Sequence, residues 1–118
     1  MALDYFRQIS GLDVDQGLKN CMDDEDLYVS ILEMYVTQLN DNLPELEGLF
    51  GNQDWETYGK TCHAIKGASA SVGAVDIQGS AASLEAAGKN MDGSAIEQGH
   101  ASFCQQLQNA VSALSAAN

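Results

Sequence analysis

Apolar residues recur every three or four positions along most of the chain, which is the pattern of amphipathic helices. The pattern predicts four long helices, at residues 24–50, 55–72, 77–89 and 94–114, preceded by two short helical segments at 3–9 and 14–21. Short turns between long helices favour an antiparallel up-and-down bundle. We therefore predict an all-α fold, a four-helix bundle with short N-terminal accessory helices, whose core runs from about residue 12 to 114 of a single domain over 1–118.

The ends of these helices carry residues that cap exposed backbone groups. N-caps are predicted at three aspartates, Asp13, Asp54 and Asp76. Ser94 and Glu97 have the spacing of a capping box and predict the start of the last helix. Pro44 lies inside the first long helix, and we expect it to bend that helix without ending it.

The second long helix separates a buried stripe from a nearly bare strip. On a helical wheel the stripe consists of Tyr58, Cys62, Ile65, Ser69 and Val72. His63 lies about 100° away from the centre of the stripe, with Gly59 one turn before it and Gly67 one turn after it. An interior glycine costs a helix about 1 kcal/mol relative to alanine. Two glycines beside one histidine therefore indicate that a large partner must reach the imidazole.

The composition narrows the class of protein. A chain of 118 residues, 45% of them hydrophobic, can form one core of ordinary size. No apolar run approaches the length of a membrane span, and the first residues lack the basic segment of a signal peptide, so we expect a cytoplasmic protein. The three cysteines match no zinc or disulfide framework and are expected to be small buried side chains: Cys21, Cys62 and Cys104.

The distribution of charge singles out the region around His63. The net charge of −12 argues against nucleic acid or an anionic membrane as a partner. Residues 60–89 nevertheless contain three of the five basic residues and only two of the seventeen acids. This local excess of positive charge would suit a site that holds a phosphoryl group and meets an acidic pocket. A chance cluster of solvated lysines is the alternative.

One segment of the chain resembles the signature of histidine-containing phosphotransfer (HPt) domains. It begins with His-Ala-Ile-Lys-Gly at residues 63–67, continues with small residues and ends with Val72-Gly73-Ala74. The resemblance extends from about Leu12 to Lys89. It implies a phosphorelay intermediate that accepts a phosphoryl group on His63 from the aspartyl phosphate of a receiver domain and passes it to another receiver domain. A neutral imidazole is a suitable nucleophile at physiological pH.

The resemblance also assigns roles to residues near His63. The conserved lysine of the family corresponds to Lys66, which we expect to approach a phosphoryl oxygen, and Gly67 corresponds to the small residue beside the imidazole. Lys60 could supply a second positive charge. Glu85 occupies the position at which some of these domains place an acceptor for the non-reacting imidazole nitrogen, and Gln78 is the alternative acceptor.

The expected partners are response-regulator receiver domains and a sensor histidine kinase, which we expect to be a hybrid kinase. Docking is expected on the exposed face of the His63 helix, at Gly59, Lys60, Gly67 and four small residues: Ala64, Ala68, Ala70 and Ser71. We expect a monomer that binds no metal or cofactor of its own, with Mg²⁺ supplied by the receiver domain, and thus a phosphocarrier and not an enzyme.

Two other classes of function remain open from the sequence. One is an adaptor of the same fold that sequesters a receiver domain without accepting phosphate. The other is a structural helical bundle that associates with itself. His100 lacks the lysine-glycine context of His63 and is expected to serve in packing or at the surface.

Overall fold

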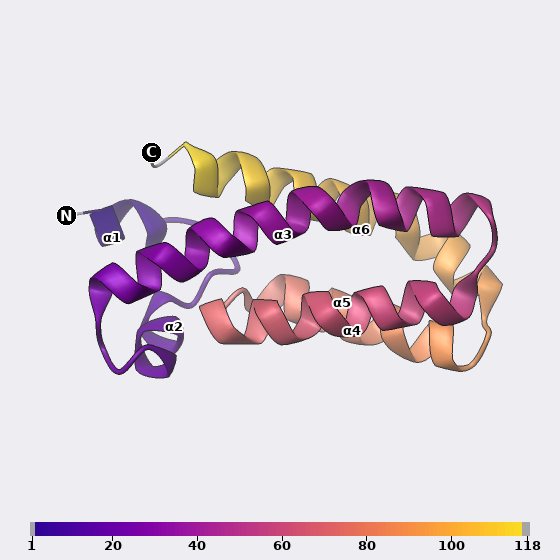
Figure 1. The fold of residues 1–118 in the computed structure, drawn as a ribbon, viewed down its shortest axis with the longest axis horizontal. Coiled ribbons are helices and arrows are strands. Elements are labelled where there is room, and N and C mark those ends of the chain that lie inside the picture. The colour runs from indigo at the N-terminus through magenta and orange to yellow at the C-terminus, as the bar shows by residue number, and fades with distance from the viewer. Residues whose placement is uncertain (1, 117–118) are drawn as a thin grey trace.

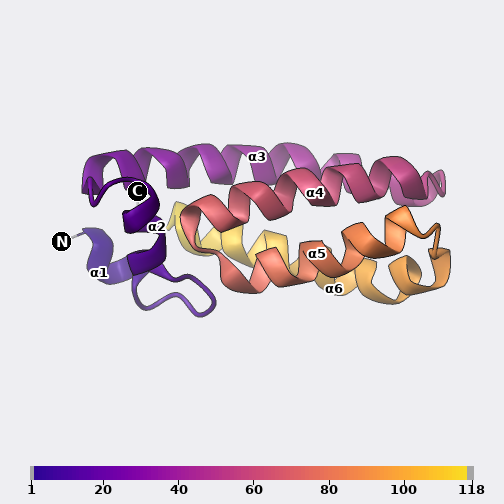
Figure 2. The same cartoon turned by 90° about the horizontal axis from the view of Figure 1, so that it is seen from below.

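The computed structural model describes residues 2–116, which form six α-helices (Figure 1). The helices are α1 (Ala2–Phe6), α2 (Val14–Asn20), α3 (Glu25–Gly51), α4 (Trp55–Val72), α5 (Val75–Lys89) and α6 (Gly93–Ser115). The four long helices run antiparallel to their neighbours along the chain (Figures 1 and 2). Helices α3 and α5 each pack against both α4 and α6. The predicted four-helix bundle is thus confirmed.

The two short helices close one end of the bundle, as the prediction of accessory elements requires (Figure 2). The Tyr5 hydroxyl of α1 donates a hydrogen bond of 2.7 Å to the carbonyl oxygen of Ala113 in α6. The Asn20 amide of α2 donates to the carbonyl oxygens of Ala70 and Ser71, at 3.3 and 3.2 Å. The bonds from Asn20 add partners for two carbonyl groups in the last turn of α4, where the regular helical pattern of hydrogen bonds ends. The opposite end of α4 stays clear of α1 and α2.

Aspartate caps begin most of the helices, but two of the predicted starts are wrong. Helix α6 begins at Gly93, because Asp92 already accepts a hydrogen bond from the Ala95 N–H and places Ser94 inside the helix. Helix α5 begins at Val75, which places Asp76 in its first turn. The N-cap there is Ala74, without a side-chain bond, because the tight turn from α4 is closed by backbone contacts of Gly73 and Ala74.

The predicted stripe of α4 is the centre of the core. Each of its five residues is at most 1% exposed: Tyr58, Cys62, Ile65, Ser69 and Val72. The polar member, Ser69, forms a hydrogen bond of 2.6 Å with the Tyr35 hydroxyl of α3, so its burial leaves no unmatched group. Because this face of α4 is held against α3, the opposite face is turned to solvent.

Several smaller expectations are also met. Helix α3 passes through Pro44 as one element. All three cysteines are buried and free: Cys21, Cys62 and Cys104. Within residues 2–116, none of the helices combines the length and the apolar character that crossing a membrane requires.

Candidate functional site

His63 stands on the exposed face of α4 and is held from α5. Its side chain is 67% exposed, and its Nδ1 atom lies 2.8 Å from the Oε2 atom of Glu85. An ionised carboxylate can only accept hydrogen bonds, so Nδ1 carries the proton of the neutral ring. The lone pair is then on Nε2. The arrangement fixes both the orientation and the tautomer of an accessible imidazole.

Glu85 is the buried centre of a small charge cluster. Its side chain is 5% exposed and also pairs with two lysines. The Lys66 Nζ atom lies 2.6 Å from Oε1, and the Lys89 Nζ atom lies 3.1 Å from Oε2. The hydrogen bond from Lys66, supported by those from Lys89 and His63, lowers the pKa of Glu85 to about 2, although desolvation acts in the opposite direction. Glu85 is therefore an anion throughout the physiological pH range.

Lys66 and Lys89 affect how well the imidazole of His63 can act as a nucleophile. A buried carboxylate beside a histidine favours the protonated ring, which has no lone pair for nucleophilic attack. Lys66 and Lys89 compensate the charge of Glu85, so that it can hold the Nδ1–H group with less attraction for a second proton. The cluster thus favours an oriented imidazole that remains a nucleophile.

Three of the residues singled out from the sequence meet here, namely His63, Lys66 and Glu85. Lys60 does not join them, because its Nζ atom lies 3.5 Å from a Glu56 oxygen on the same helix. The Nδ1 acceptor is Glu85 and not Gln78, which is half-buried earlier on α5. Sequence reasoning did not assign Lys89 to the site. The available signal was its spacing, four residues after Glu85, which places both on one face of a helix.

The two glycines that flank His63 have different surroundings. A Cβ atom at Gly67 would have no atom within 4 Å, so this position leaves open space beside the ring. Gly59 is buried, and its Cβ atom would lie 3.2 Å from the Cα atom of Gly88. The expectation that Gly59 gives a partner clearance is therefore wrong. Its missing side chain allows α4 and α5 to pack closely, and this approach brings Glu85 within reach of His63.

The predicted docking face is open near His63 and more covered toward the end of α4. Ala64 is exposed, and Ala68 is half-buried. Ser71 is exposed, but it and the half-buried Ala70 lie where α2 packs on the helix. On the other side of His63 is a surface cavity between α4 and α5. Its lining comprises Glu56, Gly59, Lys60, His63, Glu85, Gly88, Lys89 and Met91.

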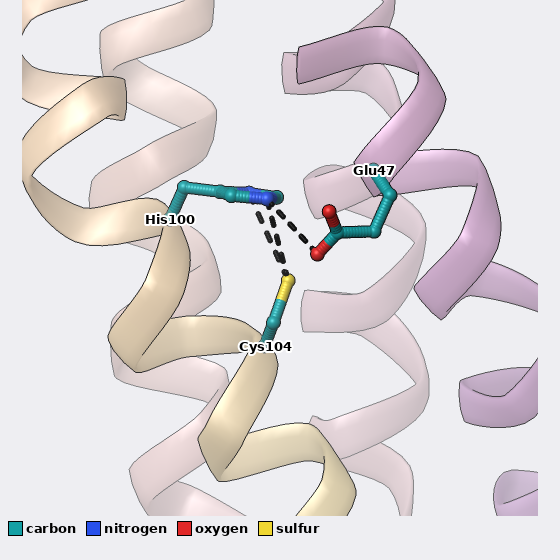
Figure 3. Close-up of side chains that lie close together, drawn as sticks. All are labelled: Glu47, His100 and Cys104. Carbon is teal, nitrogen blue, oxygen red and sulfur yellow. Dashed lines mark hydrogen bonds and ion pairs between the residues drawn. The ribbon is translucent and has the colours of Figure 1, made fainter. Parts of the chain in front are cut away.

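A second polar cluster lies between α3 and α6 (Figure 3). The Nε2 atom of buried His100 lies 3.2 Å from an oxygen of Glu47, and the Cys104 Sγ atom lies 3.7 Å from both ring nitrogens. Burial raises the pKa of the Cys104 thiol to about 12. The Nδ1 atom of His100 also bonds the Tyr58 hydroxyl at 2.8 Å, and Phe50 stacks on the ring.

The side chains of Glu47, His100 and Cys104 are of types that bind zinc, and their ligand atoms lie within 4.8 Å of one another. Because Sγ is equally far from both nitrogens of His100, it lies over the face of the ring (Figure 3). A metal bound by His100 would lie in the ring plane, along a nitrogen lone pair. The arrangement therefore fits packing better than metal ligation, in agreement with the packing role expected for His100.

Comparisons with known proteins identify the family and the fold of the chain. The sequence model of the Hpt domain matches residues 30–117. A crystal structure of the HPT domain from a sensor hybrid histidine kinase of Shewanella superposes with a TM-score of 0.78. It is 22% identical, and the match covers 89% of this chain and 91% of that one, which shows a shared fold. No curated protein sequence matches the chain.

Proposed function

This chain belongs to the Hpt domain family, whose members transfer phosphoryl groups in phosphorelays, and we propose that His63 is the residue that carries the phosphoryl group. One observation above all supports this assignment. The His63 ring is 67% exposed, its Nδ1–H group is engaged by a buried carboxylate, and its Nε2 atom is left free. The structure describes a second histidine, His100, which is 5% exposed and cannot meet a partner protein.

In the proposed reaction, Nε2 of His63 attacks the phosphorus atom of an aspartyl phosphate on a receiver domain. The nitrogen–phosphorus bond forms as the bond from phosphorus to the aspartyl oxygen breaks, and the aspartate leaves as a carboxylate with that electron pair. The ring, which keeps its proton on Nδ1, becomes positively charged. Glu85, 2.8 Å from Nδ1, compensates this charge. The reverse sequence transfers the group to a second receiver domain.

The chain contributes the nucleophile and its positioning residues, and the partner contributes the remaining groups. Glu85 already bonds His63, Lys66 and Lys89, so this carboxylate is not available as a metal ligand. We infer that the receiver domain supplies the Mg²⁺ and most catalytic groups, which makes this protein a phosphocarrier. The Lys66 side chain is 34% exposed. As the phosphoryl group arrives, the Lys66 ammonium would exchange part of its contact with Glu85 for a hydrogen bond to a phosphoryl oxygen.

Membership of the family implies interaction with receiver domains and histidine kinases. We propose that the kinase is a hybrid kinase, that the protein acts as a cytoplasmic monomer, and that residues 1–118 work as a single domain. Receiver domains would dock on the open part of α4, at Lys60, Ala64, Gly67 and Ala68. Ala70 and Ser71 would lie at the margin of that contact, close to α2.

The experiment uses receiver domains labelled with ³²P on aspartate, incubated with the native protein and with His63→Gln. We expect label on the native protein only, in a bond that is lost in acid and survives base, as a nitrogen–phosphorus bond does. Equal labelling of the variant would rule out His63. If the native protein binds a receiver domain but accepts no label from any of them, the protein is an adaptor that sequesters receivers.

A further inference from the structure

Met91, in the turn between α5 and α6, lines the same cavity as His63. It is one of the few large hydrophobic residues on the surface, with 59% of its area exposed. Its neighbours in the cavity lining include Lys60 and Lys89, which are 74% and 73% exposed. The wall beside the imidazole thus combines two cations with one flexible apolar side chain.

The backbone at Met91 is of a kind that usually selects glycine. Its φ angle is 53°, in the left-handed region, which disfavours residues with a Cβ atom. Glycine is the usual residue at such a position after a helix end. Glycine at this position would therefore relieve the backbone. Met22, Asp23 and Gln53 share the same conformation, so the case for a function of Met91 rests on its place in the cavity wall.

The chemistry of transfer determines what must cover this cavity. An aspartyl phosphate is short, so a receiver domain that delivers it to Nε2 of His63 must bring its own surface against the cavity lining. The lysines complement the acidic pocket expected around such a phosphate. Met91 would then lose contact with water against the partner, and burial of apolar area is favourable.

Building on the proposed function, we propose that Met91 is an apolar anchor for receiver domains, contacting the surface that borders their phosphorylated pocket. A relay intermediate must bind a donor and an acceptor through one face. Methionine suits this requirement, because its unbranched side chain adapts to differently shaped surfaces. Loss of the Met91 side chain should weaken binding without altering the reacting groups.

The test compares Met91→Gly with Met22→Gly, since the chain contains a matched control. Met22 also has a left-handed backbone, with φ 56°, and is 91% exposed. It follows α2, at the end of the bundle away from the cavity. Glycine relieves the backbone at both positions, so neither variant should be less stable than the native protein. A change in binding then cannot be attributed to unfolding.

The probe is the receiver domain that binds the native protein most tightly, held in its active form as the beryllium fluoride complex. We expect Met91→Gly to raise the dissociation constant about tenfold, from the apolar area that stays uncovered. Met22→Gly should leave it unchanged, and Met91→Leu should restore most of the affinity. Equal constants for the two glycine variants would overturn the proposal, as would a leucine variant no better than Met91→Gly.

The same proteins separate this proposal from the assignment of His63. At a saturating concentration of phosphorylated receiver domain, Met91→Gly should be labelled as fast as the native protein, whereas His63→Gln should not be labelled. A slower reaction of Met91→Gly at saturation would place Met91 in the transfer step and overturn its role as an anchor. If the native protein binds without accepting label, the relay assignment fails, and the comparison of affinities still decides the role of Met91.

Discussion

His63 and Lys89 are bonded to the same oxygen of Glu85, from opposite helices of the α4–α5 pair. The two distances to Oε2 are 2.8 Å from His63 Nδ1 and 3.1 Å from Lys89 Nζ. Because they share one acceptor, the charge that Glu85 presents to the imidazole depends on whether the lysine is present. Lys66 bonds the other oxygen and acts on the ring through the same carboxylate.

Lys89→Ala should slow phosphotransfer about two- to fivefold, the range expected for one largely exposed ion pair. The reason is that a less compensated Glu85 attracts a second proton to the ring. Transfer of label from a phosphorylated receiver domain at a saturating concentration measures this rate, and Lys89→Arg should restore it.

Lys60→Ala is the matched control, because Lys60 lines the same cavity at nearly the same exposure but pairs with Glu56. At a saturating concentration of receiver domain, Lys60→Ala should transfer phosphate at the native rate. If both lysine variants slow transfer equally, general surface charge explains the effect, and Lys89 has no specific action through Glu85.

Glu85 should also give the protein a distinct dependence of stability on pH. Its pKa is lowered from 4.5 to about 2 in the folded chain, chiefly by the bond from Lys66. The carboxylate therefore stabilises the fold fully above pH 4.5, and this contribution is lost as the pH falls from 4.5 toward 2. In Glu85→Gln, the free energy of unfolding should decline less steeply over that interval.

Urea titrations at a series of pH values would measure this slope. The control is Glu56→Gln, because the Glu56 side chain is 72% exposed and pairs with a lysine that is itself at the surface. Its slope should match that of the native protein. A native slope in Glu85→Gln would show that the cluster does not hold the carboxylate ionised.

The sequence was sufficient for the elements and for the orientation of each helix, because periodicity identifies the buried face directly. It assigned Tyr58 and Cys62 to the core and His63 to the surface of the same helix, and the structure agrees. Helix starts were less certain. A run of capping residues such as Asp92 and Ser94 offers alternatives that differ by a residue or two.

Relations between helices were harder to foresee, because they depend on how far two helices slide and how closely they approach. The contact of Gly59 with Gly88 sets that approach for α4 and α5. The helical wheel of α4 alone assigned Gly59 instead to clearance around the imidazole. Lys89 and Met91 belong to the site for the same reason. They lie more than twenty residues from His63, and only the packing of α5 on α4 brings them to it.

Gly67 tests whether open space beside the imidazole serves a partner or is incidental. A Cβ atom at Gly67 would have no atom within 4 Å, and the same is true of Gly79 in α5. Both lie inside helices, so alanine should raise the free energy of unfolding by about 1 kcal/mol at either position.

If the space serves docking, Gly67→Ala should nevertheless weaken receiver binding and slow phosphotransfer, because a methyl group would stand one turn from His63 on the approached face. Gly79→Ala should gain the same stability and transfer at the native rate. Native transfer by both variants would show that Gly67 is not needed for access to the imidazole.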